Sequence, residues 1–179
     1  MIRYIPNTLT LSRVAAIPLL LLLYPDFKHA CGLVIFLVAM SDIFDGRIAR
    51  WYKVESKFGS HIDPITDKMF DAATFLILVG GGVLSPWFAV VIICRDILIS
   101  GIRLVALEQK FSIDVHWSGK IKSLFTAPAV FGLFINEEFL WIPCHEGGMF
   151  FMWVTLFFTL YSGFIYLNDF RIKYMKSVA

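Results

Sequence analysis

The chain has 179 residues, of which 58% are hydrophobic and 17% are charged. Soluble domains carry about 25% charged residues, so an apolar content this high cannot all be buried in one small core and must partly face lipid. The net charge of +2 does not indicate a nucleic-acid partner, and three cysteines without paired spacing give neither a disulfide framework nor a zinc site. No long polar stretch is available for a second domain, so we expect one domain over residues 1–179.

A bilayer-spanning helix needs about 20 mainly apolar residues, and six stretches approach that length. In chain order they cover residues 8–24, 31–50, 66–84, 86–107, 121–136 and 147–169. Turn-forming or polar segments separate them, such as Tyr24–Asp26, Gly80–Gly82 and the run 108–120. The first stretch lacks a small-residue cleavage site, so we expect it to be retained. The pattern predicts an all-α integral membrane bundle of six transmembrane helices.

The basic residues gather on one side of such a bundle. With six spans and both chain ends together, that side holds Arg3, Arg13, Arg47, Arg50, Lys53, Lys57, Lys110, Lys120, Lys122, Arg171, Lys173 and Lys176. The opposite side holds only Lys28. Because Lys and Arg mark the cytoplasmic side, we predict a multi-pass protein of the cytoplasmic (inner) membrane with both termini in the cytoplasm.

Four aspartates stand where two of these helices meet the cytoplasm. Asp42 and Asp45 are three residues apart near the end of the second stretch, and Asp63 and Asp67 are four apart near the start of the third. Each pair therefore shares a helical face. Carboxylates this close repel one another unless cations neutralise them, and an all-oxygen set suits Mg²⁺ or Mn²⁺. The spacing predicts a catalytic metal site at the cytoplasmic ends of the helices.

Gly46 and Pro64, next to two of the aspartates, bear on the prediction of a metal site. Gly46 follows Asp45, and a missing side chain there lets a bulky nucleotide diphosphate approach the helix backbone. Asp63 has a purely structural alternative, since Asp followed by Pro64 is a good helix start. That alternative leaves Asp42 and Asp45 unexplained, because carboxylates near a helix C-terminus oppose the helix dipole.

The residues from 42 to 67 form a recognisable motif. They read Asp42-x₂-Asp45-Gly46-x₂-Ala49-Arg50-x₈-Gly59-x₃-Asp63-x₃-Asp67. The motif resembles the signature of the CDP-alcohol phosphatidyltransferase family at every fixed position. The similarity extends to Pro6-Asn7-x-Leu9-Thr10-x₂-Arg13, to segments 58–68, 95–103 and 119–122, and to the six-helix plan. In segments 58–68, 95–103 and 119–122 the chain is most similar to bacterial members that use glycerol 3-phosphate as acceptor.

The resemblance implies transfer of the phosphatidyl group of CDP-diacylglycerol to the hydroxyl of glycerol 3-phosphate, with release of CMP. It implies two Mg²⁺ or Mn²⁺ ions about 4 Å apart, held by Asp42, Asp45, Asp63 and Asp67. Asp67 is the implied base, with Asp63 as the second catalytic carboxylate. The implied CDP site comprises Asn7, Thr10, Asp42, Asp45, Gly46, Ala49, Arg50 and Gly59. Members of the family are commonly homodimers among membrane lipids, so a second copy is the expected protein partner.

Four basic residues outside the motif resemble the family's pocket for the acceptor phosphate: Arg95, Arg103, Lys120 and Lys122. Arginine forks and lysine point charges suit phosphate recognition. Two structural alternatives remain open. The lysines could anchor a helix at the anionic cytoplasmic leaflet, and Arg95 could pair with Asp71 or Asp96.

Two departures from the family pattern keep other functions open. Residues Ser123–Thr126 replace a Thr-Thr-x-Gln run, so the acceptor could instead be inositol phosphate, serine, or phosphatidylglycerol as in cardiolipin synthesis. Asp71 occupies a position that is commonly apolar.

A remote alternative is an ion transporter, because acidic residues in membrane helices also mark ion pathways. Transporters more often place such residues near mid-membrane with repeat symmetry, and no repeat is visible here.

Overall fold

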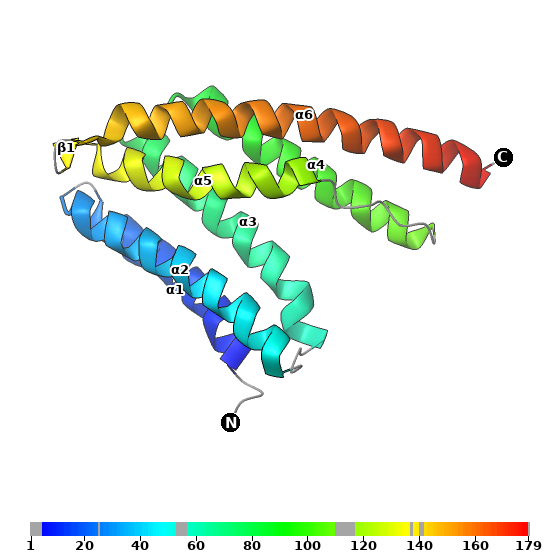
Figure 1. The fold of residues 1–179 in the computed structure, drawn as a ribbon, viewed down its shortest axis with the longest axis horizontal. Helices are drawn as coiled ribbons and strands as arrows, with labels where there is room; N and C mark the ends of the chain where they lie inside the picture. Colours follow the sequence, from blue (N-terminus) through cyan, green and yellow to red (C-terminus); the bar gives the residue numbers. More distant parts are fainter. Residues whose placement is uncertain are drawn as a thin grey trace.

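The computed structural model describes the backbone of residues 5–24, 26–52, 57–109, 117–136, 138–139 and 142–178. Side chains are described for residues 13–24, 26–40, 64–109, 117, 119, 121–136 and 143–175. Over these ranges the chain forms helices α1 (Ile5–Leu23), α2 (Lys28–Tyr52), α3 (Lys57–Gly80), α4 (Pro86–Glu108), α5 (Trp117–Ile135) and α6 (Cys144–Val178) (Figure 1). Two short strands, β1 (Glu138–Phe139) and β2 (Ile142–Pro143), connect α5 to α6.

Each predicted apolar stretch coincides largely with one helix, so the all-α class is confirmed. The helices are longer than the apolar stretches, because a helix continues through polar residues that a hydropathy pattern excludes. The third helix begins at Lys57 rather than at residue 66, and the sixth runs to Val178. The sequence did not predict the antiparallel pairing of Glu138 with Pro143 and of Phe139 with Ile142.

The helices form two limbs that diverge from a shared end (Figure 1). The N-terminal limb comprises α1, α2 and the first half of α3, and the C-terminal limb comprises α4, α5 and α6. Contacts of α2 with α5 and of α3 with α4 join the limbs, while α5 and α6 form the most extensive pair. The ends of α2 and α4 and the starts of α3 and α5 lie where the limbs are spread apart.

The shared end holds the main core. Its fully buried side chains include Leu20, Cys31, Phe75, Leu78, Ile92, Leu133, Phe134 and Met152. Two glycines let α5 and α6 approach closely, since a Cβ on Gly132 would lie 2.7 Å from the Cys144 carbonyl oxygen and one on Gly148 would lie 2.8 Å from the Leu133 nitrogen. All three cysteines are free, as the sequence predicts.

The surface of α6 fits an apolar environment. Residues 147–168 contain no charged side chain, and exposed Phe150, Trp153, Phe157 and Phe164 project from them. At 1.5 Å per residue this stretch crosses about 30 Å, the thickness of a hydrocarbon core. In the part of the chain that the structure describes, one helix segment, Cys144–Met175, is long and apolar enough to span a membrane. Three others, Arg13–Leu23, Lys28–Met40 and Ile121–Ile135, are apolar but shorter, so the number of six spans stays a prediction.

Candidate active site

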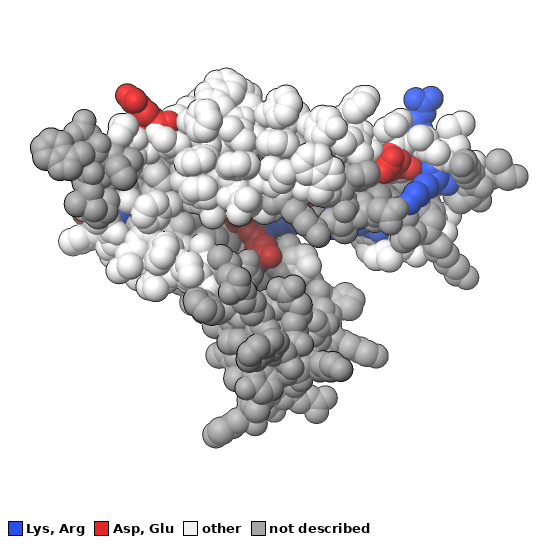
Figure 2. Space-filling model, in the orientation of Figure 1, with Lys and Arg blue, Asp and Glu red and all other residues white. Residues whose placement is uncertain are grey.

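Asp67 lies on α3 near the point where the two limbs diverge. Its side chain is 49% exposed and forms an ion pair with Arg13 of α1, whose side chain is only 11% exposed. A buried guanidinium therefore holds one oxygen of a carboxylate that is otherwise open to the space between the limbs. On the face shown in Figure 2, acidic and basic side chains lie next to each other near the middle of the molecule.

Most other residues of the predicted metal and CDP sites lie on described backbone but outside the described side chains. They are Asn7, Thr10, Asp42, Asp45, Gly46, Ala49, Arg50, Gly59 and Asp63. Their helices are α1, the last half of α2 and the start of α3. The backbone thus places every one of them on the N-terminal limb, on helices α1, α2 and α3.

The alternative role of Asp63 as a helix cap is wrong. Helix α3 begins at Lys57, so Asp63 and Pro64 both lie inside it. Pro64 has no backbone N–H and cannot bond to the carbonyl of residue 60, and the helix continues through it with one bond fewer. Capping therefore gives no structural reason for a carboxylate at this position.

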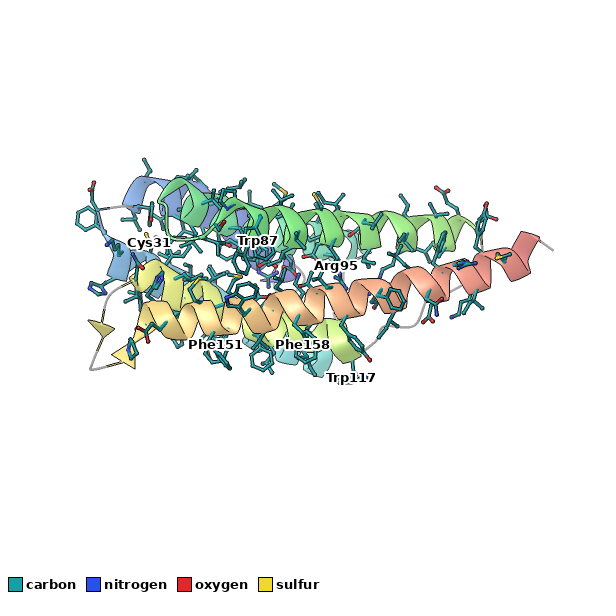
Figure 3. The ribbon with its side chains drawn as sticks, turned by 90° about the horizontal axis from the view of Figure 1, so that it is seen from above. Cys31, Trp87, Arg95, Trp117, Phe151 and Phe158 are labelled. Carbon is teal, nitrogen blue, oxygen red and sulfur yellow. The ribbon has the colours of Figure 1, made fainter. Side chains whose placement is uncertain are left out.

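Arg95 lies in the interior between α4 and α6 (Figure 3). Its Nη1 donates to Asp96 Oδ1 at 2.9 Å and its Nη2 donates to Ser162 Oγ at 2.5 Å. Gly163 leaves room for the aliphatic stem, because a Cβ there would lie 3.4 Å from Arg95 Cγ. The Nε of Arg95 is buried and makes no hydrogen bond to the described part of the chain. A buried donor of this kind calls for a ligand or water to complete it.

Asp96 connects α4 to α5. Its second carboxylate oxygen accepts a bond from Lys122 Nζ, and the Lys122 residue is only 5% exposed. A lysine that anchors a helix at a membrane surface extends its ammonium into water. Lys122 does the opposite, so the anchor alternative is wrong for this residue. The side chain of Lys120 lies outside the described set. Of the two partners predicted for Arg95, the structure selects Asp96.

Two more cations lie nearby: Arg103 contacts the same Tyr166 ring as Arg95, and Lys68 interacts electrostatically with Asp96. Arg103 Nη2 donates to Tyr166 Oη at 2.6 Å, and its guanidinium lies 5.1 Å from the centroid of that ring. Lys68 Nζ bonds to Ser100 Oγ, and Lys68 is within electrostatic range of Asp96, Arg95, Arg103 and Lys122. We call Lys68, Arg95, Arg103 and Lys122, together with Asp96, the cationic cluster.

The cationic cluster has four positive charges and one negative charge, a net charge of +3. Placing uncompensated charge in a partly buried site is unfavourable unless an anion joins it. Sequence reasoning found three of the four cations and named Asp96 as a possible partner of Arg95, but it missed the roles of Lys68, Ser162 and Tyr166. Lys68 had a recognisable signal, because it directly follows Asp67 near an apolar stretch.

Comparison with known proteins covers both the aspartate motif and the cationic cluster. Residues 3–161 match the profile of the CDP-alcohol phosphatidyltransferase family. The chain belongs to this family. The match spans the aspartate motif and the whole cationic cluster, while Ser162 and Tyr166 lie just beyond it, and it confirms the resemblance read from residues 42–67.

Relatives of nearly equal length carry one name, "CDP-diacylglycerol--glycerol-3-phosphate 3-phosphatidyltransferase". The protein from Pectobacterium atrosepticum is 36% identical over 179 residues, which covers 93% of this chain and 94% of the relative. The proteins from Bacillus subtilis and Yersinia pestis are 30% and 34% identical, each over 92% of this chain and 93% of the relative. This phosphatidyltransferase is therefore an enzyme of the transferase class.

The donor chemistry of the family site fits a hard divalent cation. Asp67 offers carboxylate oxygen, half exposed beside a cavity, and no thiolate or imidazole lines that cavity. Among the described side chains no three His, Cys, Asp or Glu residues gather as a metal site, and three of the four predicted ligands lie outside that set. The predicted ligands therefore remain a proposal.

Proposed function

We propose that this phosphatidyltransferase transfers the phosphatidyl group of CDP-diacylglycerol to glycerol 3-phosphate and forms phosphatidylglycerophosphate. The family match and the common name of the relatives support the reaction class and both substrates. The observation that favours a phosphorylated acceptor over serine is the cationic cluster with the buried Arg95 Nε, and the names of the relatives point to glycerol 3-phosphate among such acceptors. Serine has no phosphate to neutralise a charge of +3, whereas glycerol 3-phosphate brings a dianion.

The donor site is assigned to the N-terminal limb. Asp42, Asp45, Asp63 and Asp67 would hold two Mg²⁺ or Mn²⁺ ions, and Asn7, Thr10, Gly46, Ala49, Arg50 and Gly59 would complete the CDP site. Bound ions would neutralise the diphosphate of the donor and the departing CMP. The proposal is supported by the motif spacing and by the carboxylate of Asp67, which faces the space between the limbs.

Individual side chains would have separate roles in this reaction. The acceptor hydroxyl oxygen bonds to the phosphatidyl phosphorus, the bond from that phosphorus to the CMP oxygen breaks, and CMP leaves with the bonding electrons. Asp67 takes the hydroxyl proton, for which it must lie within hydrogen-bond reach of the acceptor. Arg13 orients the Asp67 carboxylate through their ion pair. Arg95 and Lys122, with Arg103, Lys120 and Lys68 nearby, hold the acceptor phosphate.

The membrane arrangement completes the proposal. Residues 1–179 form one domain with six spans in the cytoplasmic membrane, and the termini and active site face the cytoplasm. The uncharged stretch of α6 and the sorting of Lys and Arg along the chain support this orientation. Membrane lipids surround the bundle, and a second copy of the chain is the proposed partner.

An acceptor panel tests the function. Purified protein with CDP-diacylglycerol and Mg²⁺ or Mn²⁺ should release CMP with glycerol 3-phosphate, and not with inositol phosphate, serine or phosphatidylglycerol. CMP release with only one of the other three would overturn the proposed acceptor. Metal flux in liposomes without any CMP release would instead favour the transporter alternative.

A further inference from the structure

A cavity of about 430 Å³ lies beside Asp67, between α2, α3 and α5. Its apolar lining includes Ile35, Val38, Phe70 and Val130. Its polar lining consists of Arg13, Asp67, Asp71, Thr74, Ser123 and Thr126. The polar set includes Asp71 and part of the Ser123–Thr126 segment, which are the two departures from the family pattern.

The lining hydroxyls present acceptors rather than donors to this cavity. Thr74 Oγ1 donates to the Asp71 carbonyl oxygen at 2.8 Å, and Thr126 Oγ1 donates to the Lys122 carbonyl oxygen at 2.9 Å. Ser123 Oγ donates to the Gly119 carbonyl oxygen at 3.3 Å. A hydroxyl has one proton and two lone pairs, so each of these side chains has only lone pairs left to offer.

The carboxylates of Asp67 and Asp71 add further acceptors, since an ionised carboxylate cannot donate. Among the described side chains that line the cavity, Arg13 is the one that can only donate, and it is paired with Asp67. Apart from a metal ion at Asp67, an occupant that satisfies these oxygens must therefore donate hydrogen bonds. A polyhydroxylated molecule does this, whereas an acyl chain does not.

The cavity adjoins the cationic cluster on two helices. Asp71 is three residues beyond Lys68 on α3, and Ser123 directly follows Lys122 on α5. At 1.5 Å per residue, these separations along each helix axis are at most about 5 Å. One small acceptor can thus place its phosphate at the cationic cluster and its hydroxyls in the cavity.

We infer that Asp71 is a specificity-determining residue that accepts a hydrogen bond from the non-reacting hydroxyl of the acceptor. The inference rests on the proposed function and adds the part of the site that recognises a polyol. Asp71 already interacts within the chain, but a carboxylate has about four lone-pair sites and can accept several bonds. An acceptor without the second hydroxyl would lack this hydrogen bond to the half-buried Asp71 carboxylate and should be turned over less efficiently.

The test compares two acceptors in the full-length enzyme by CMP release. Glycerol 3-phosphate has a reacting hydroxyl and a middle hydroxyl, and 3-hydroxypropyl phosphate lacks only the middle one. The wild-type enzyme should prefer glycerol 3-phosphate in kcat/KM by about 10- to 100-fold, as expected for a hydrogen bond to a charged group. In Asp71→Val the preference should fall below about 3-fold, with turnover of the analogue kept within about 2-fold of wild type. Asp26→Asn, an exposed aspartate in the α1–α2 turn, is the matched control and should keep the wild-type preference.

Turnover of the analogue by Asp71→Val also reports that the variant is folded. An unchanged acceptor preference in Asp71→Val overturns the inference while the proposed function stands. If Asp71→Val is inactive with both acceptors, Asp71→Asn decides: a reduced preference supports the inference, and the wild-type preference overturns it. A wild-type enzyme that releases CMP with neither acceptor overturns the proposed function and this inference together.

Discussion

The two limbs contribute side chains of opposite charge to the proposed site. The N-terminal limb contributes the four motif aspartates, and the one described in full, Asp67, is held by Arg13 from a neighbouring helix of the same limb. The C-terminal limb contributes Arg95, Arg103 and Lys122 around Asp96, and Lys68 joins them from α3. The acidic side is suited to cations on a diphosphate, and the basic side to a free phosphate.

The limbs also differ in how their sites are assembled. The aspartates come from one stretch of 26 residues, so helical spacing alone predicts that they share faces. The basic residues come from α3, α4 and α5 and are oriented by Ser162 and Tyr166 of α6. A site whose residues lie in one short motif can be predicted from the sequence. A site assembled from four helices can be identified only when the packing of those helices is known. The following predictions separate the two limbs by substrate.

The largest effect is expected on the acidic side. Asp67→Asn removes the proposed base and should lower kcat by about 10²- to 10⁴-fold, the usual range for a general base. Steady-state CMP release measures it, with the exposed Asp26→Asn as control. Activity within a few-fold of wild type in Asp67→Asn would contradict the proposed catalytic role of the acidic site on this limb.

On the basic side, Asp96→Asn should act on one substrate only. The neutral amide no longer holds Arg95 and Lys122 as ion pairs, so KM for glycerol 3-phosphate should rise by about 10-fold or more. KM for CDP-diacylglycerol should stay near the wild-type value. Glu108→Gln changes an exposed carboxylate on the same helix and should alter neither constant. An equal rise in both KM values would show that Asp96 supports the fold rather than the acceptor site.

A substitution at the shared end, where α5 packs on α6, should affect the stability of the fold rather than one of the two substrate sites. Gly148→Ala places a methyl group against the backbone of α5 and should reduce the free energy of unfolding by about 1–3 kcal/mol. Gly147→Ala is the matched control, because a Cβ there meets nothing within 4 Å. Thermal unfolding in detergent compares the two variants. Equal melting temperatures would contradict the close packing of α5 on α6.

The smallest expected effect tests the hydrogen bond that orients Arg95. Ser162→Ala removes the oxygen bonded to Arg95 Nη2 and should raise KM for glycerol 3-phosphate by about 5-fold, as expected for a loss of about 1 kcal/mol. Ser85→Ala, at a serine that makes no side-chain cap bond, serves as control. No change in KM would indicate that Asp96 alone positions Arg95.

The sequence by itself determined the helical class, the approximate place of each helix and the family. Apolar stretches of this length specify helices in lipid, because only a helix satisfies its own backbone hydrogen bonds there. The motif spacing identified the aspartates because residues three and four apart share a helical face. The helix start at Lys57 was not predicted, since the apolar stretch begins only at residue 66 and the helix continues through Pro64 and the polar residues before it.

Only the tertiary structure decided how the acceptor side is built. Residues 68, 96, 122 and 162 lie on four helices, and no periodicity within one helix relates them. Their proximity follows from the packing of α4 on α3 and α6 and of α5 on α6, and Gly163 leaves room for Arg95. That packing turned Lys122 from a candidate surface anchor into a buried partner of Asp96. Charge pairing across helices depends on distances in space, and the order of residues along the chain does not specify them.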